Sequence, residues 1–465
     1  MEANFSRVVG AATPGVALLL CLIACSPSPR LLLLISVDTL RADQLGAYGS
    51  RRGLTPELDA FAAESVVFSA AYAPAALTLP SISSLLTGRY PEELGILTNE
   101  SSVPESAPTL ASELSARGWR TGAVVGNFVL RRSAGLARGF DLFDDDFPQN
   151  EVVRKWPERI AEDATRVILA MLDDCTVEAD ARCFLWVHYQ DPHGPYDPPP
   201  ELRARFLDAE RAAPGGDRRL PVGTDHSGIG AIPAYQYLKG HRDVAFYRAG
   251  YLAEIAYLDA EIGRLMRALR DRGLFDEALI VFAADHGESL GEAGVWFAHG
   301  EHLTDDQVRV PLLVHLPGTP AQRREDVVSL VDVFPTLLAL LGEAPVDPDG
   351  VGRDLFAEAA AEQASRPYLA TLGGSRTVRY GIIGDGFKFV MSDREGVWDG
   401  RLHRLGREDV DLGLAAPQVA ASMRQQLRAA RARMKRGAPE APQALSDADR
   451  DRLGALGYVE EQETR

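Results

Sequence analysis

The sequence lacks several features that would place it in a simple class. It has no long run of Lys or Arg and a formal net charge of −17, which argues against binding nucleic acid through the phosphate backbone. It has no internal repeat, which argues against a repeat architecture. Its N-terminal apolar run is too short to span a bilayer. What remains is an ordinary globular composition, and 465 residues are enough for one large domain and a smaller one.

Cysteine is also scarce, and one of the four cysteines marks a processing signal. Residues 16–24 form a short apolar run that leads into Leu-Ile-Ala-Cys, a tetrapeptide that resembles a bacterial lipobox. This predicts a lipoprotein signal peptide over residues 1–24, a lipid anchor to the membrane at Cys25 and a tether over residues 25–30. A plain secretory signal and a short membrane anchor are the alternatives. In each case we expect an exported protein, in the periplasm or at the cell surface.

Export changes what the other cysteines can do. Cys21 leaves with the signal peptide and Cys25 is acylated, so Cys175 and Cys183 are the pair left in an oxidising compartment. They flank a short polar stretch, and we expect a disulfide that closes it. Two independent buried thiols are the alternative, whereas a zinc site lacks the second ligand pair that its spacing requires.

Continuous apolar runs alternate with helical patterns along the first three quarters of the chain. Residues 31–37, 184–187 and 279–284 have the length and composition of strands buried on both faces. Further strands are expected at residues 66–68, 120–126 and 310–315, and helices from residue 55 and at 110–117, 157–172, 247–269 and 332–341. This alternation predicts an α/β layered fold.

Acidic residues and histidines directly follow the buried strands. Asp38 follows the first strand, His188 and His193 lie at the end of a later one, and Asp285 and His286 follow another. Ligands of open parallel sheets bind at the carboxyl ends of the strands, so these side chains are placed for function. Two carboxylates and an imidazole suit one divalent cation such as Mg²⁺, Ca²⁺ or Mn²⁺, or Zn²⁺ if more nitrogen joins.

The segment of residues 77–88 predicts a hydroxyl at the start of a short helix. Thr78 is expected as the N-cap, Pro80 fits the first turn, and Gly88 supplies a left-handed end. A side-chain oxygen at a helix start lies among unpaired backbone N–H groups, which favour a tetrahedral anion beside it. Taken alone, a Thr at this position is more often structural than functional.

The last part of the chain has a different character. Short strands are expected at residues 380–383 and 387–391, joined by a Gly-Asp-Gly turn, and a basic helix at residues 419–435. The helix alternates Arg with Ala and lacks a large aromatic face, which favours a solvated packing helix over a membrane-binding one. We expect a C-terminal subdomain over residues 356–465, with a small antiparallel sheet and a helix.

Five segments, in their order and spacing, resemble motifs of the sulfatase family of the alkaline phosphatase superfamily. They are Ser36–Asp43, Thr78–Gly88, His188–Tyr196, Ala284–Glu288 and Arg309–Leu312. The resemblance implies an α/β/α sandwich with a central, largely parallel mixed sheet, and a nucleophile on the helix after the first metal ligand. It covers a catalytic domain over residues 31–355, in which residues 197–242, rich in Pro, Gly and charge, are expected to form a long loop, lid or insertion over the site.

The resemblance also assigns roles by position. It implies a divalent metal ion held by Asp38, Asp285 and His286. Thr78 occupies the nucleophile position, and His193 resembles the histidine that meets the anionic group or protonates the leaving oxygen. The remaining catalytic candidates are His188 and His299.

The sequence departs from the family pattern at several of these positions. Thr78 replaces the Cys or Ser that matures to formylglycine, and Ile82 replaces an Arg. Thr39 follows Asp38 where many members have a second Asp, and residues 126–129 read Gly-Asn-Phe-Val in place of Gly-Lys-Trp-His. Formylglycine cannot form from Thr, but an activated Thr hydroxyl can attack phosphorus.

These residues predict an atypical family member: a metal-dependent hydrolase that cleaves a phosphate or sulfate ester with Thr78 as nucleophile. A phosphotransferase acting on lipid headgroups or glycans is one alternative. A noncatalytic binding lipoprotein that kept the fold is another. The sequence does not name the small-molecule, glycan or lipid ester, and it leaves the oligomeric state open.

Overall fold

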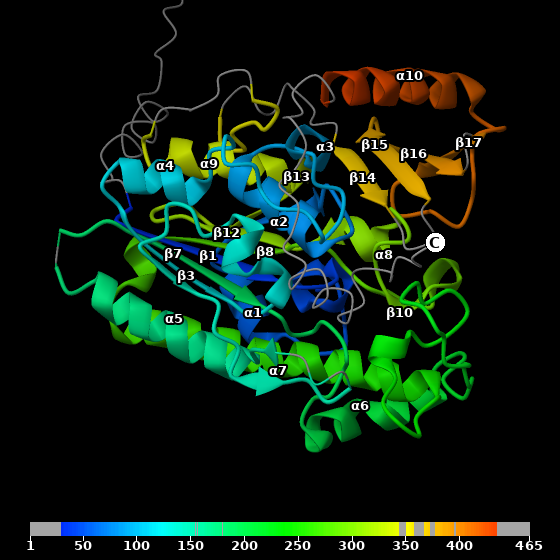
Figure 1. Ribbon diagram of the computed structural model, residues 1–465, viewed down its shortest axis with the longest axis horizontal. Helices are drawn as coiled ribbons and strands as arrows, with labels where there is room; N and C mark the ends of the chain where they lie inside the picture. Colours follow the sequence, from blue (N-terminus) through cyan, green and yellow to red (C-terminus); the bar gives the residue numbers. More distant parts are fainter. Residues whose placement is uncertain are drawn as a thin grey trace, which may run out of the picture.

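A nine-stranded mixed sheet lies between two layers of helices (Figure 1). The computed structural model describes residues 29–434 except 154, 156, 179, 344–349, 358–366, 373–376 and 395–396. In spatial order the strands are β11 (Arg309–Val310), β2 (Val66–Tyr72), β12 (Leu312–His315), β8 (Ala278–Ala284), β1 (Leu31–Val37), β7 (Cys183–Tyr189), β3 (Arg120–Val125) and β4 (Leu142–Asp144), with β13 (Gln322–Ser329) beside β2. Neighbours are parallel from β8 to β4 and antiparallel at β12. The predicted α/β/α architecture with a largely parallel mixed sheet is confirmed.

Helices cover both faces of the sheet (Figure 1). One layer holds α1 (Pro56–Ala62), α5 (Ala161–Cys175) and α7 (Val244–Asp271), and the other α2 (Thr78–Thr87), α4 (Leu110–Ala116) and α9 (Val333–Leu340). Other elements outside the main sheet and these two layers are α3 (Pro91–Leu94), α6 (Pro200–Ala212), α8 (Asp305–Val308), β5 (Gln149–Asn150), β6 (Pro157–Glu158), β9 (Ser289–Leu290) and β10 (Trp296–Ala298). None of the helices in the described part of the chain has both the length and the apolar character to cross a membrane.

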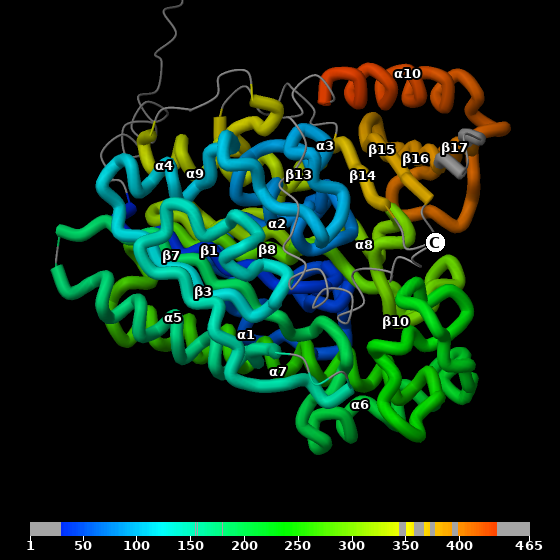
Figure 2. Tube along the Cα trace, viewed as in Figure 1, coloured from blue at the N-terminus to red at the C-terminus, as the bar shows by residue number. Residues whose placement is uncertain are grey.

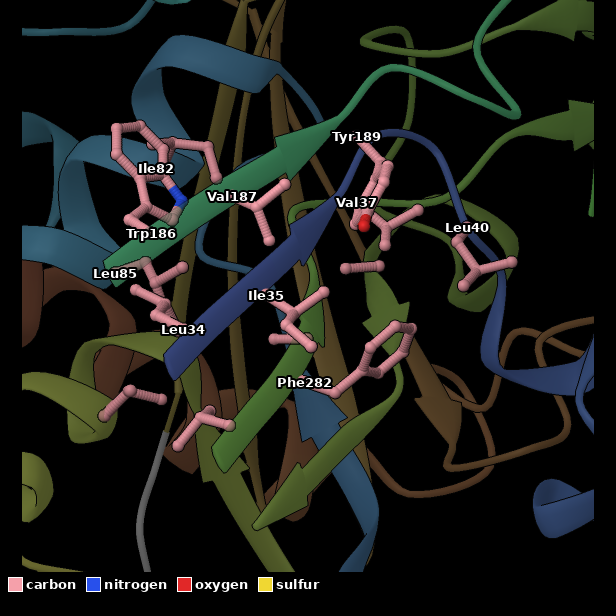
Figure 3. Packing of buried hydrophobic residues seen from close by; sticks show 14 of the residues in the cluster. Leu34, Ile35, Val37, Leu40, Ile82, Leu85, Trp186, Val187, Tyr189 and Phe282 are labelled. Atoms are coloured by element: carbon pink, nitrogen blue, oxygen red, sulfur yellow. The ribbon is translucent and has the colours of Figure 1, made fainter. Parts of the chain in front are cut away.

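The central strand β1 is buried along its whole length, as its unbroken apolar sequence predicts. Leu34 of β1 and Trp186 of β7 point toward Ile82 and Leu85 of α2 (Figure 3). Each such fully buried side chain stabilises the fold by about 1.5–3 kcal/mol relative to its exposed form. This packing fixes α2 against the sheet.

The register of the central strands brings three chain segments to one edge. Val37 pairs with Tyr189 on one side and with Ala284 on the other, so the three strands end at the same level. The next residues continue the ladder: the Asp38 N–H donates to the Tyr189 carbonyl and the Asp285 N–H to the Val37 carbonyl, each at 3.0 Å. The side chains that follow these strands therefore meet.

Some local expectations were wrong. The strand expected at residues 310–315 is split at Pro311, which has no N–H for the ladder, into β11 and β12. The long loop expected over residues 197–242 contains the helix α6, which packs on α7. Its apolar stripe is short, with Leu202 and Phe206 half-buried among charged residues, so the sequence pattern hides it.

A disulfide joins Cys175 at the end of α5 to Cys183 at the start of β7, as predicted. Because α5 packs against β7, the bond closes the turn between two neighbouring elements. Cys21 and Cys25 lie outside the described residues, as do the predicted signal peptide and most of the tether.

A separate antiparallel sheet follows the main one. Its strands are β14 (Tyr368–Leu372), β15 (Val378–Gly384), β16 (Phe387–Arg394) and β17 (Val397–Arg404). The helix α10 (Pro417–Met434) lies over this sheet and buries Met423 and Leu427 against it, as a packing helix does (Figure 2). Gly386 has a φ of 80°, the left-handed conformation that the turn between β15 and β16 requires.

Candidate active site and metal centre

Three predicted metal ligands converge at the carboxyl edge of the main sheet. One ligand atom each of Asp38, Asp285 and His286 lies within 4.8 Å of the other two, and all three side chains are fully buried. Asp38 directly follows β1, while Asp285 and His286 directly follow β8. The parallel register of β1 and β8 therefore explains how residues nearly 250 positions apart (Asp38 and Asp285) come together.

The lone pairs of these three side chains lie close together. His286 Nδ1 lies 2.9 Å from the Gly287 carbonyl, which can only accept, so the proton is on Nδ1 and the lone pair is on Nε2. His286 Nε2 is 3.7 Å from Asp38 Oδ1 and 3.5 Å from Asp285 Oδ2. Neither carboxylate oxygen has a hydrogen-bond partner among the described residues. Such a set of oxygen and nitrogen donors fits a divalent cation.

Burial and neighbouring charges shift the pKa values of all three side chains. Burial, and then the neighbouring Asp38, raise the pKa of Asp285 well above its ordinary value. Burial would also raise the pKa of Asp38, but the imidazoles of His193, His188 and His286 hold it well below its usual range. Burial and the facing His299 lower the pKa of His286 to about 3, so its imidazole is neutral and able to bind a metal.

Asp38 is fixed by side chains from the neighbouring strands. Asn127 Nδ2, just beyond β3, donates to Asp38 Oδ2 at 2.5 Å. His188 Nε2 lies 3.7 Å from the same oxygen, and its Nδ1 lies 2.9 Å from Ser36 Oγ. His188 is thus placed to hold Asp38 from the neighbouring strand β7. Such outer contacts orient a metal ligand and keep its second oxygen free.

Thr39 takes an unusual backbone conformation at the position where many family members have a second Asp. Its φ is 54°, which is costly for a β-branched residue, and its backbone N–H donates to Asp285 Oδ1 at 3.2 Å. The Tyr251 hydroxyl donates to the Thr39 carbonyl at 2.7 Å and holds this turn from α7. Strain of this kind is kept where the surrounding structure requires a defined geometry.

Thr78 lies in the same corner, with its side chain fully buried. Its Oγ1 is 3.4 Å from His286 Nε2. The expectation that Thr78 is the N-cap was wrong by one residue: Leu77 is the N-cap, since its carbonyl accepts from the Ser81 N–H at 3.1 Å. Because Thr78 is the first residue of α2, its hydroxyl is not used as a cap and faces the metal ligands.

Asn99 caps α2 from outside the helix, and no local pattern in the sequence predicts this contact. Its Oδ1 accepts from the Leu79 N–H at 2.9 Å, beside Thr78 at the start of α2. The side chain is buried, and its Nδ2 has no hydrogen-bond partner among the described residues. Asn99 therefore brings a free N–H donor close to the Thr78 backbone.

Two more histidines line the corner. The His299 ring lies 4.5 Å from the ring of His286 and 5.3 Å from that of His193. His193 Nδ1 contacts the Gly194 carbonyl at 2.7 Å, which leaves Nε2 as the atom that can take or give a proton. The structure thus gathers Thr78, His193 and His299 around the metal ligands.

Glu288, known from the sequence only as part of a motif, holds His299. Glu288 Oε1 lies 3.2 Å from His299 Nδ1, and Glu288 Oε2 accepts from the Tyr196 hydroxyl at 2.9 Å. Burial raises the pKa of Glu288 to about 7, although the charge of His193 opposes this shift. Tyr235, which lies between α6 and α7, also contacts the site: its ring stacks on the His193 ring with 6.2 Å between the centroids.

A profile of the sulfatase family matches residues 30–343, and the chain belongs to this family. A curated relative, the ulvan-active sulfatase of Formosa agariphila, is 28% identical over 354 residues, which is 71% of this chain and 65% of that protein. The match thus spans slightly less than two thirds of the relative's length.

Solved structures share the fold. One, determined in complex with its substrate D-glucosamine-2-N,6-O-disulfate, superposes with a TM-score of 0.74 at 19% identity and covers 88% of this chain and 98% of its own. The phosphonate monoester hydrolase of Agrobacterium radiobacter superposes with a TM-score of 0.69 at 21% identity, covering 87% and 96%. The fold expected from the sequence is that of both structures.

Proposed function

We propose that this protein is a metal-dependent hydrolase that cleaves a phosphate or sulfate ester with the Thr78 hydroxyl as nucleophile. One observation carries the proposal: Thr78 Oγ1 lies 3.4 Å from His286 Nε2, in the corner where the unpartnered Asp38 and Asp285 oxygens also converge. A nucleophile beside a cation-binding set is the arrangement that ester hydrolysis at phosphorus or sulfur requires.

The identity of residue 78 favours phosphorus. A formylglycine can expel sulfate by returning to its aldehyde, whereas Thr has no such exit and needs water or an alcohol to open its ester. Ile82, at the position of the family's Arg, is fully buried against Trp186 and offers no charge to a sulfate (Figure 3). The names of similar proteins include both ulvan-active sulfatase and phosphonate monoester hydrolase. The preference for a phosphorus ester therefore rests on the residues of the site.

The proposed ester hydrolysis has two steps. Thr78 Oγ1 loses its proton to solvent and bonds to phosphorus, while the bond from phosphorus to the alcohol oxygen breaks and that oxygen takes a proton from His193 Nε2. Water then attacks phosphorus, its proton returns to His193 Nε2, and the bond to Thr78 Oγ1 breaks as this oxygen regains a proton. Asn99 Nδ2 has no hydrogen-bond partner among the described residues, lies near the start of α2 and would hold an anionic oxygen of the ester.

Asp38, Asp285 and His286 would hold the metal. A divalent cation there would supply Lewis-acid chemistry, since it lowers the pKa of the Thr78 hydroxyl and offsets charge on the ester oxygens. The two carboxylates admit Mg²⁺, Ca²⁺ or Mn²⁺, and the imidazole nitrogen admits Mn²⁺ or Zn²⁺.

A phosphotransferase is the second candidate. If an alcohol in place of water opens the Thr78 ester, the group passes to a glycan or lipid headgroup. The solved relative with a bound sulfated glucosamine and the relative named for ulvan make a glycan ester the first class to test. A noncatalytic binding protein is the third candidate, and absence of any divalent ion in freshly purified protein, with none bound on titration, would favour it.

The test is a panel of aryl phosphate monoesters and diesters, aryl phosphonate esters and aryl sulfates, assayed with protein loaded in turn with Mg²⁺, Ca²⁺, Mn²⁺ and Zn²⁺. We expect turnover of a phosphorus ester, at least about 10³-fold slower in Thr78→Val, with metal binding retained. Thr87→Val is the matched control, because it removes another buried hydroxyl of α2. Full activity in Thr78→Val would exclude the Thr nucleophile, and turnover of sulfate esters alone would overturn the preference for phosphorus.

We also propose that the mature protein is exported and anchored to a bacterial membrane by a lipid on Cys25. The lipobox-like sequence before Cys25 supports this. Labelling of cells with a radioactive fatty acid should mark the wild type and not Cys25→Ser. An unlabelled wild type with an intact N-terminus would refute the anchor.

A further inference from the structure

The loop after β10 decides where His299 lies. His299 directly follows β10 and is succeeded by Gly300, which has a φ of 86°. A Cβ at residue 300 would lie 3.0 Å from Leu77 Cδ2, so the turn leans directly on the residue before Thr78. A shift of this loop would therefore move His299 relative to the nucleophile.

The C-terminal sheet holds the other side of this loop. Thr371 in β14 is fully buried, and its Oγ1 donates to the Gly300 carbonyl at 3.0 Å. The preceding residue, Ala370, donates its N–H to the Pro74 carbonyl at 2.9 Å, on the segment that leads to Thr78. Two adjacent residues of β14 thus bind both the loop after β10 and the segment that leads to Thr78.

A buried ion cluster fixes the far end of the loop. Lys388 in β16 is fully buried, and its Nζ donates to the Leu303 carbonyl at 2.9 Å and to Asp305 Oδ1 at 2.6 Å. Glu408 completes the cluster: it contacts Lys388 Nζ and accepts from the Asp305 N–H at 2.7 Å. The loop is therefore held at residue 300 and again at residues 303–305, both times by the C-terminal sheet.

We propose that the C-terminal sheet is part of the active-site framework, and that Thr371 and Lys388 are positioning residues that set the place of His299 beside Thr78. Neither residue touches the ester. They act through the backbone of residues 300–305, which they join to the strand that also holds Pro74. The kinetic part of this proposal rests on the proposed hydrolase function, while its structural part does not.

The test compares Thr371→Val with Thr371→Ser in the full chain. Val keeps the shape and the strand propensity of Thr but removes the hydroxyl, whereas Ser keeps the donor. Amide hydrogen exchange over peptides of residues 297–305 should become about tenfold faster in Thr371→Val, because one buried hydrogen bond is lost. It should return to the wild-type rate in Thr371→Ser and stay there in the control Thr87→Val.

Turnover on the aryl ester that the wild type cleaves gives the second reading. We expect a five- to tenfold lower kcat in Thr371→Val with KM nearly unchanged and the bound metal retained, and recovery in Thr371→Ser. Lys388→Arg, which keeps the charge, should exchange more slowly than Lys388→Met in the same peptides.

Unchanged exchange in Thr371→Val would overturn the proposal. So would a faster loop with wild-type kcat. If the wild type cleaves no ester, the hydrolase function fails, and the exchange rates still decide whether the sheet holds the loop.

Discussion

The molecule contains two buried clusters of opposite character, close to the two ends of the same loop. Around Lys388, one ammonium group is enclosed by Asp305, Glu408 and the Leu303 carbonyl. Around His286, two fully buried carboxylates face a neutral imidazole. The first cluster is completed by its own chain and the second is not. A buried charge without a partner is expensive, so a site that keeps one implies a ligand from outside.

The pKa values separate the clusters in the same way. Burial would lower the pKa of Lys388, but the charges of Asp305 and Glu408 hold it above its ordinary value. In the other cluster, burial and the neighbouring Asp38 raise the pKa of Asp285, whereas the imidazoles of His193, His188 and His286 hold the pKa of Asp38 below its usual range against the effect of burial. The charges of the first cluster balance within the chain, whereas the oxygen and nitrogen donors of the second fit a divalent cation.

The largest effect on metal binding and turnover should follow from replacing one of the predicted metal ligands in the cluster around His286. Asp285→Asn should weaken metal binding by about 100-fold or more and lower turnover by at least about 10³-fold. The free energy of unfolding of the metal-free protein should stay the same or increase, because an unpaired buried carboxylate is gone. Metal titration by calorimetry and thermal denaturation measure the two, with the exposed Asp409→Asn as control. A marked decrease in the free energy of unfolding of the metal-free variant would contradict the proposed difference between the two clusters.

The cluster around Lys388 should respond in the opposite way, because the protein should lose stability when one of its charged residues is replaced. Lys388→Met leaves Asp305 and Glu408 without their cation and should lower the free energy of unfolding by about 3–5 kcal/mol, with the metal stoichiometry unchanged. Urea denaturation gives this value. Neutralising all three residues together should recover most of the loss, and a triple variant as unstable as Lys388→Met would show that the cluster is more than a charge balance.

Removing the metal should further distinguish the cluster around His286 from the cluster around Lys388. A ligand at 100 times its dissociation constant stabilises the native state by about 2.7 kcal/mol, so chelation should lower Tm and added cation should restore it. Asp285→Asn should show no such shift, whereas Lys388→Arg should keep it. Equal Tm with and without chelator, in protein freshly purified, would speak against a bound cation.

The smallest effect concerns His302, which lies on the loop between the clusters. Burial, together with the charges of Arg379 and Arg401, lowers the pKa of His302 from 6.5 to about 4. The unfolded chain then binds a proton at higher pH than the folded one, so this stability is present above pH 6.5 and lost as the pH falls toward 4. Because the side chain is partly exposed, we expect a loss of about 1–2 kcal/mol that His302→Gln reduces. Identical pH curves for both proteins would refute this assignment.

Much of the site could be predicted because it lies on the regular part of the fold. Asp38, Asp285 and His286 follow unbroken apolar strands, and parallel strands end at one edge. The register then brings these residues together without any detailed knowledge of loops.

The rest depends on contacts that no local pattern encodes. Asn99 caps α2 across 20 residues, and Glu288 holds His299 across an irregular hairpin. The N-cap is Leu77 and not Thr78, and the remote Asn99 accepts from the Leu79 N–H. The hold of Thr371 on Gly300 joins segments 71 residues apart, so only the assembled chain shows it.

We expect two buried acids and one imidazole to hold a divalent cation beside the Thr78 hydroxyl. Anomalous diffraction from crystals soaked in Mn²⁺ can locate this cation. A single strong peak should lie between Asp38 Oδ1, Asp285 Oδ2 and His286 Nε2, within bonding distance of Thr78 Oγ1. No peak at this position, or a Thr78 side chain turned away from a bound ion, would contradict it.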